Sequence, residues 1–276
     1  MHKKDFVERS IRSALSFFKE AIFAEETAYL HGVLQPIDPR VKIASALLFI
    51  LLTLFTHSLT VLSFLYLLSI LLAVLSGIRL GFFLKRTWIF IPLFSLMIAI
   101  PALFSFVSPG EPVMSVGAFH ITQHGIMAAS FFVGRVITSV SLVVLLSLTT
   151  RHFDLLKALR FFGIPQIFVM VLGICYRYIY LFVEIMENTH RAIRSRVGSV
   201  THYRKGQRVV TWNIAHLWMR SYALNEQVYN AMVSRGFRGE PVALNHFRTK
   251  PRDWLWLGGS AMIILLLAYA EHVTIL

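Results

Sequence analysis

Apolar residues are concentrated in five long runs, and most polar residues fall between them. The runs cover about 42–56, 59–77, 87–107, 125–149 and 254–275. Apolar runs of about 18 residues or more are typical of helices that cross a bilayer. The pattern predicts an all-α membrane protein with about five transmembrane helices, four of them in 42–149 and the last in 254–276.

The third run carries two prolines, Pro92 and Pro101. Transmembrane helices tolerate proline because neighbouring helices satisfy the carbonyls that it frees, so we still expect a transmembrane helix in 87–107. The connection that follows, 108–124, is rich in proline and glycine and is expected to be a loop or a hairpin.

A sixth apolar run, 164–183, is interrupted by Arg177 and followed by Glu184. A charge near the centre of a membrane helix costs about 2.5–3.5 kcal/mol on insertion scales. We therefore interpret this run as a helix that is buried against the membrane domain or lies at the interface. If it crossed the bilayer, the basic block 191–252 would face outward.

Residues 150–253 differ from the apolar runs, with sixteen Lys and Arg against six Asp and Glu. We expect a mainly helical domain, with one helix from about 165 to 196 and a second from Gly206 to just before Gly236. A glycine after the last turn is the usual left-handed C-cap. Mostly apolar positions recur every three or four residues along the second helix and predict a packing seam: Trp212, Ala215, Met219, Tyr222, Glu226, Tyr229 and Val233.

The N-terminal segment, 1–41, holds both charge signs and lacks the continuous apolar core of a secretory signal. Val7, Ile11, Leu15, Phe18 and Ile22 recur at helical spacing. This spacing predicts an amphipathic helix that lies on the membrane surface. Packing of the same helix on the protein's own cytoplasmic domain is an equal alternative.

The distribution of basic residues predicts the orientation. Residues 1–42 hold seven Lys or Arg and the 78–86 connection holds three, whereas 108–124 holds none. Because cytoplasmic loops are enriched in Lys and Arg, the N-terminus and the 150–253 domain are expected in the cytoplasm, on the inner face of the cell membrane.

Composition excludes several functional classes. The net charge of +13 would suggest nucleic acid in a soluble protein, but 56% of the residues are hydrophobic and no nucleic-acid-binding fold surrounds the charges. We expect no nucleic-acid partner. No G-x-x-x-x-G-K-[ST] loop, nucleophile motif or acid pair is present, so we expect no catalysis and no cofactor in this chain. His120 and His124 share i, i+4 spacing, which suits a metal relay on one helical face, although lone surface histidines are common.

A repeated cassette is the best lead to function. Arg191 to Arg196 reads RAIRSR and Asn230 to Arg235 reads NAMVSR, so each ends in Ser-Arg near the expected end of a helix. The planar guanidinium of arginine binds a carboxylate through two hydrogen bonds. Two similar arginines near helix ends would suit two similar grooves on partner proteins. The alternatives are that both arginines cap their own helices or bind anionic lipid head groups.

Two further sites are less specific. Asp38 and Pro39 suit the N-cap and first position of a helix, and this structural role is favoured over contact with a partner. Arg135 lies within the fourth apolar run, beside Gly134. An arginine inside the membrane suggests a functional site, but snorkelling or pairing with a carbonyl at a helix end is favoured.

Three stretches resemble the transmembrane T component of energy-coupling factor (ECF) transporters. AMVSRGF resembles the family's Ala-Arg-Gly signature, and LHGVLQPIDPRVKIASALLF, which contains Asp38 and Arg40, resembles its N-terminal segment. YRYIYLFVEIMENTHRAIRSR is similar to the cobalt-type, CbiQ-like branch. The first cassette departs from the pattern because its glycine is delayed to Gly198, which leaves Arg194 and Arg196 as alternatives; the register of the repeat favours Arg196.

The resemblance implies a scaffold that links a membrane-embedded, substrate-binding S component to two cytoplasmic ABC-type ATPases. Arg196 and Arg235 would dock into grooves on the ATPases, with Ser195, Ser234 and Gly236 shaping the helix ends. ATP would be bound and hydrolysed by the partners, and the metal would be bound by the S component. Cobalt or nickel is the expected substrate. A shared T component for vitamins and, in another class, a membrane enzyme acting on a lipid or isoprenoid are the alternatives.

Overall fold

The computed structural model describes residues 27–30, 32–88, 91–101, 112–116, 119–197, 203–239 and 249–275. The amphipathic helix expected within 1–41 falls mostly outside these residues. The chain divides into two compact units. The membrane unit comprises 25–158 and 247–276, and the α8–α9 unit comprises 1–24 and 159–246.

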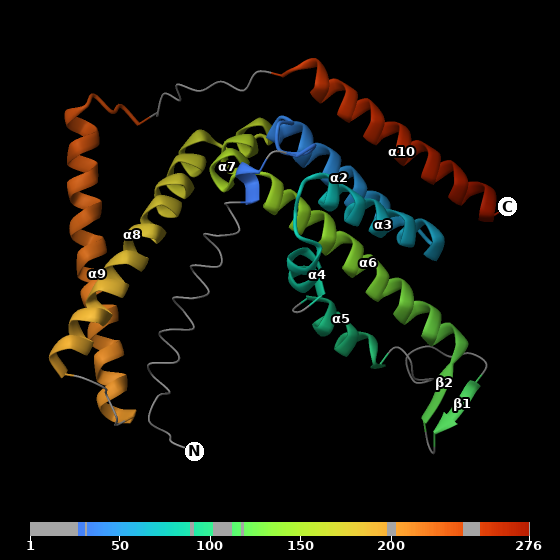
Figure 1. Ribbon diagram of the computed structural model, residues 1–276, viewed down its shortest axis with the longest axis horizontal. Coiled ribbons are helices and arrows are strands. Elements are labelled where there is room, and N and C mark those ends of the chain that lie inside the picture. The colour runs from blue at the N-terminus through green and yellow to red at the C-terminus, as the bar shows by residue number, and fades with distance from the viewer. Residues whose placement is uncertain are drawn as a thin grey trace. The chain divides into compact units, whose positions relative to one another are not determined.

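The membrane unit is built from helices and one small hairpin (Figure 1). Its elements are η2 (Thr27–Tyr29), α2 (Pro39–Phe55), α3 (Leu59–Leu75), α4 (Leu80–Trp88), α5 (Ile91–Ala99), β1 (Pro112–Val116), β2 (Phe119–Thr122), α6 (Gln123–Thr149), α7 (His152–Leu159, whose last residue belongs to the other unit) and α10 (Pro251–Ile275). The α8–α9 unit contains η4 (Arg160–Phe162), α8 (Gln166–Val197) and α9 (Tyr203–Ser234). The predicted all-α membrane fold is confirmed, with the hairpin in the 108–124 connection.

Helix α6 is the centre of the membrane unit, because α2, α3, α4 and α5 all pack on it and α10 packs on α2. Phe49, Val61, Leu65 and Leu142 form the buried core where α2, α3 and α6 meet. A hydroxyl pair, Thr53 and Ser139, joins α2 to α6 at 3.0 Å between the Oγ atoms. Many leucines on the outer faces are exposed, as expected of helices that contact lipid rather than water.

The third apolar run is split between two helices rather than continuous. Helix α4 ends at Trp88, and α5 begins at Ile91 with Pro92 as its second residue. Proline suits the first turn of a helix because its missing N–H would have no partner there. Helix α5 ends at Ala99, before Pro101. Pro92 therefore lies in the first turn of a short helix and Pro101 lies just after its end. Residues 102–111 lie outside the described residues.

Three of the described helices are long and apolar enough to cross a membrane: α6, the 166–193 part of α8, and α10. Helices α2 and α3 are also apolar but have 17 residues each. Length and composition alone do not distinguish a spanning helix from an interfacial one. The five-span arrangement, and the interfacial position of 164–183, stay predictions.

Helices α8 and α9 form an antiparallel pair (Figure 1). Their bounds agree with the predicted helices, but the residues of the predicted seam are exposed rather than packed. Trp212, Met219 and Tyr222 on that seam are 71%, 67% and 73% exposed. The partly buried face of α9 is offset around the helix and includes Val210, Leu217, Leu224 and Val228. Spacing by three and four fits both faces, so it could not indicate which one is covered.

Candidate functional site: two helix ends and a charged cavity

The second cassette forms the C-terminal cap of α9. Gly236 adopts φ +81°, its N–H donates to the carbonyl of Val233 at 2.9 Å, and the N–H of Phe237 donates to the carbonyl of Met232 at 3.0 Å. These bonds define a Schellman motif, which satisfies the last carbonyls of the helix from the backbone alone. The Ser234 hydroxyl donates to the carbonyl of Asn230 at 2.8 Å.

The first cassette ends α8 in a related way. The Ser195 hydroxyl donates to the carbonyl of Ala192 at 2.9 Å, and Arg196 is the last residue but one of the helix. Arg196 and Arg235 are both exposed. Within the described part of the chain, neither guanidinium hydrogen-bonds a carbonyl of its own helix, so self-capping does not account for them. The side chain of Arg194 lies outside the described residues.

The two cassettes lie at opposite ends of the helix pair. Helices α8 and α9 have 32 residues each and run in opposite directions. At 1.5 Å per residue, each helix is about 48 Å long. Arg196 therefore lies near the start of α9, whereas Arg235 lies beyond its other end. The arginines cannot enter one groove together, but they can enter two.

Arg135 makes a structural contact inside the membrane unit. Its Nη2 donates to the carbonyl of Thr56 at 2.8 Å, and Thr56 is the C-cap of α2. A cation at a helix C-terminus is favoured by the helix dipole. Arg135 therefore pairs with a carbonyl at a helix end, which is one of the two structural roles that the sequence favours for it.

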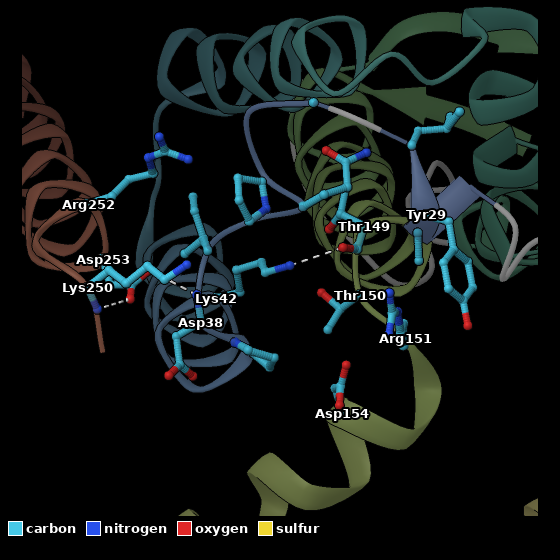
Figure 2. Close-up of a pocket in the computed structure, with 17 residues that line it drawn as sticks. Tyr29, Asp38, Lys42, Thr149, Thr150, Arg151, Asp154, Lys250, Arg252 and Asp253 are labelled. Atoms are coloured by element: carbon cyan, nitrogen blue, oxygen red, sulfur yellow. Dashed lines mark hydrogen bonds between the residues drawn. The ribbon is translucent and has the colours of Figure 1, made fainter. Parts of the chain in front are cut away.

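A charged cavity of about 670 Å³ lies at the end of the membrane unit where α2 and α10 begin and α6 ends (Figure 2). Asp38 is the N-cap of α2, and its Oδ1 accepts from the N–H of Arg40 at 2.9 Å, as the sequence predicts for this role. Asp253 accepts from two backbone amides: Asp38 N donates to Oδ1 at 2.9 Å and Lys250 N donates to Oδ2 at 2.7 Å. The starts of the first and last long helices of the unit are thus held by one carboxylate.

Lys42 is the buried cation of this cavity, with 4% of its surface exposed. Its Nζ donates to the carbonyl of Thr149, at the end of α6, at 3.0 Å. The carboxylates of Asp154, Asp38 and Asp253 interact with it electrostatically. Sequence reasoning missed Lys42. The available signal was its position four residues after Asp38, which places both on one face of α2.

The cavity corrects one expectation. No acid cluster is visible in the sequence, yet the fold brings Asp38, Asp154 and Asp253 together around Lys42. Two of these carboxylates accept hydrogen bonds from backbone N–H groups at helix starts. This is the role of a helix cap rather than of a catalytic acid. Among the described residues, no group of three His, Cys, Asp or Glu could hold a metal ion.

The chain passes from one unit to the other at three places, 24/25, 158/159 and 246/247. Each of these passages lies close in sequence to residues that line the cavity. Cavity-lining residues include Ala28, Asp154 and Lys250, each within four residues of a passage.

The proposed histidine pair is not arranged as expected. His120 lies in β2, whereas His124 lies in the first turn of α6. Helix α6 begins at Gln123 because the Thr122 side chain caps it, accepting from the N–H of Gly125 at 3.1 Å. The two histidines therefore do not share a helical face.

The amino-acid sequence is similar to a family of known transport proteins. The family model described as CbiQ, cobalt transport protein, matches residues 31–244. An uncharacterized protein of Methanocaldococcus jannaschii is 31% identical over 99% of this chain and 94% of its own length. The energy-coupling factor transporter transmembrane protein EcfT of Lacticaseibacillus paracasei is 26% identical over 84% of this chain and 91% of its own. The nickel permease LarQ of Lactiplantibacillus plantarum is 29% identical over 45% of each chain.

The match covers most of the membrane unit and the whole α8–α9 helix pair, including both Ser-Arg cassettes and the Asp38 segment. It agrees with a multi-pass membrane protein that has a role in transport. The chain belongs to the CbiQ family of cobalt transport proteins, the cobalt-type transmembrane components of energy-coupling factor transporters.

Proposed function

We propose that this chain couples two ABC-type ATPases to a membrane-embedded S component during the import of cobalt or nickel ions. It lies in the cytoplasmic membrane with its N-terminus inside, and its ATPase partners hydrolyse the ATP. The observation that carries the proposal is the pair of exposed arginines at opposite ends of the α8–α9 pair. A scaffold that binds two similar ATPases at once needs two similar binding sites, far enough apart for each ATPase to occupy one.

Each arginine side chain inserts into a groove on one ATPase in this mechanism. The guanidinium enters a groove on one ATPase and binds a carboxylate there through paired hydrogen bonds, a contact worth about 1.5–3 kcal/mol. The backbone cap at Gly236 leaves the Arg235 side chain available for the partner. Movement of the ATPases then shifts the two helix ends.

The exposed seam of α9 provides a surface for the S component. Trp212, Met219 and Tyr222 are 71%, 67% and 73% exposed. Large aromatic side chains supply much of the energy of protein interfaces. The movement reaches the membrane unit through the three passages beside the charged cavity.

The nature of the substrate is inferred from the family. The family model is described as a cobalt transport protein, and one relative is named a nickel permease. The ligands that select the metal are assigned to the S component. A T component shared among vitamin transporters is the second candidate, because another relative is named only as an energy-coupling factor protein.

Co-purification tests the scaffold. The full-length chain is expressed with its candidate partners and purified in mild detergent, and we expect two ATPase copies and one S component with it. The variant Arg196→Glu/Arg235→Glu should lose the ATPases and the uptake of labelled cobalt or nickel, yet retain the S component. The matched control is Arg208→Glu/Arg220→Glu, which reverses two exposed charges within α9.

Wild-type uptake by the cassette variant would overturn the docking role. Turnover of a lipid or isoprenoid by the purified chain alone would favour the membrane enzyme instead.

A further inference from the structure

The charged cavity contains polar atoms that no described residue satisfies. Thr150 is 3% exposed and its Oγ1 has no hydrogen-bond partner within the described part of the chain. Oε1 of Gln35 also has no hydrogen-bond partner among the described residues, although Nε2 of the same side chain donates to the carbonyl of Ser76 at 2.8 Å. Buried polar groups are normally paired, and an exception calls for a missing partner. Figure 2 shows Thr150, Lys42 and Asp154 directed toward the same hollow.

Cations outnumber carboxylates by four to three among the residues that line the cavity. Four cations line it: Lys42, Arg151, Lys250 and Arg252. Of the three carboxylates, Asp38 and Asp253 already accept backbone N–H groups. The guanidinium of Arg151 lies 4.1 Å from the centre of the Tyr29 ring, which holds the charge at the cavity edge. The cavity is therefore suited to an anionic group with several acceptor oxygens.

An apolar groove adjoins the polar cavity. This second hollow, of about 730 Å³, runs along the first turns of α10 between Pro251, Trp254, Leu255, Gly258 and Gly259, and it shares Lys250 with the cavity. Trp254 is 69% exposed. Tryptophan and tyrosine are enriched where membranes meet water, so Trp254 and Tyr29 mark the level of the lipid head groups.

We propose that the cavity and the groove together bind one anionic phospholipid of the cytoplasmic leaflet. The Arg151 guanidinium and the Thr150 hydroxyl bind the phosphodiester, because charge-assisted hydrogen bonds to phosphate are the strong ones, and Lys250, which lines both hollows, adds positive charge between the phosphodiester and the acyl chain. One acyl chain lies in the groove along α10. The joined polar and apolar hollows favour a lipid over a soluble phosphate compound, which would leave the groove empty.

Asp154 tunes the affinity of this site. No hydrogen bond or ion pair to its carboxylate is formed within the described residues, and it faces the cavity from α7. Its negative charge opposes a phosphodiester. The substitution Asp154→Asn should therefore tighten the binding of an anionic lipid about threefold by removing like-charge repulsion. A side chain with a merely structural role would not produce a gain.

Native mass spectrometry of the full-length protein in detergent tests the proposal. Three probes are titrated: dioctanoyl phosphatidylglycerol, glycerol phosphate and dioctanoylglycerol. We expect one phosphatidylglycerol to be retained and both half-ligands to bind at least about tenfold more weakly, because each lacks one part of the contact. Equal affinity for glycerol phosphate and the phospholipid would overturn the lipid assignment.

Charge reversal separates this site from general attraction to a basic surface. Arg151→Glu/Lys250→Glu should weaken phosphatidylglycerol binding by at least about tenfold, whereas Lys85→Glu/Arg86→Glu, in α4 and outside the cavity, should not. Thr150→Val is a milder variant that removes the hydroxyl alone and should weaken binding about fivefold. Equal losses in the cavity and control variants, or unchanged binding by Thr150→Val and Asp154→Asn, would contradict the proposal.

Discussion

The carboxylate of Asp253 accepts a hydrogen bond from the backbone amide of Asp38, 215 positions away in the chain. Both residues stand at helix starts: Asp38 is the N-cap of α2, and Asp253 is the third residue of α10. The same carboxylate accepts from the N–H of Lys250, immediately before α10, which is the reciprocal half of a capping box. The last long helix of the membrane unit is thereby held to the first.

This relationship predicts a loss of stability in Asp253→Ala. The substitution leaves one buried N–H group, of Asp38, and one partly buried N–H group, of Lys250, without an acceptor, and each hydrogen bond to a charged group contributes about 1.5–3 kcal/mol. The loss should appear as a lower midpoint in thermal unfolding of the detergent-solubilised protein. Glu226→Ala, which removes an exposed carboxylate on α9, is the control and should leave the midpoint unchanged. Equal midpoints for the two variants would show that the Asp253 contacts add nothing.

The cap of α9 gives a second prediction. Gly236→Ala places a Cβ on a residue at φ +81°, where steric space is open but the backbone conformation disfavours any L side chain. We expect a cost of about 1 kcal/mol, paid by partial opening of the cap and a displaced Arg235. ATPase binding should weaken, as measured by titration of the purified partner. Gly81→Ala is the matched control, because Gly81 lies within α4, has open space around its Cβ position and lines neither hollow.

Separation of the two cassettes predicts independent effects. Arg196→Lys and Arg235→Lys keep the charge but lose the planar fork, and each should weaken ATPase binding about tenfold. Sites more than about 10 Å apart usually combine additively in free energy, and these lie about 45 Å apart along an antiparallel pair of long helices. We therefore expect additive free energies in a double-mutant cycle, with ATPase binding measured for both single variants and the double variant.

A strong coupling energy in that cycle would indicate that the arginines act on one partner surface, against the two-groove arrangement. If Arg196→Lys alone had no effect, Arg194 would be the working arginine of the first cassette.

Local signals in the sequence predicted the helix ends well, because caps depend on neighbouring residues. Gly236 and the Asp38-Pro39 pair act where their types indicate. The charged cavity could not be predicted in this way. Its residues come from three distant parts of the chain, and only the packing of α2, α6 and α10 brings Lys42, Thr149 and Asp253 together. The seam of α9 shows a second limit, since a periodic pattern does not indicate which of two offset faces is covered.

Lys42 supports a final prediction about the cavity. Its ammonium is buried, donates to the carbonyl of Thr149, and faces three carboxylates. Lys42→Met keeps the length of the side chain but removes both the donor and the charge, leaving the carboxylates without their buried cation. Removal of one partner from a buried charged group costs about 3–5 kcal/mol, so the unfolding midpoint should fall by an amount similar to that of Asp253→Ala. Asp154→Asn in the Lys42→Met background should restore part of the loss, because it removes one of the uncompensated charges. If this second substitution lowered the midpoint further, Lys42 would act through packing rather than through charge.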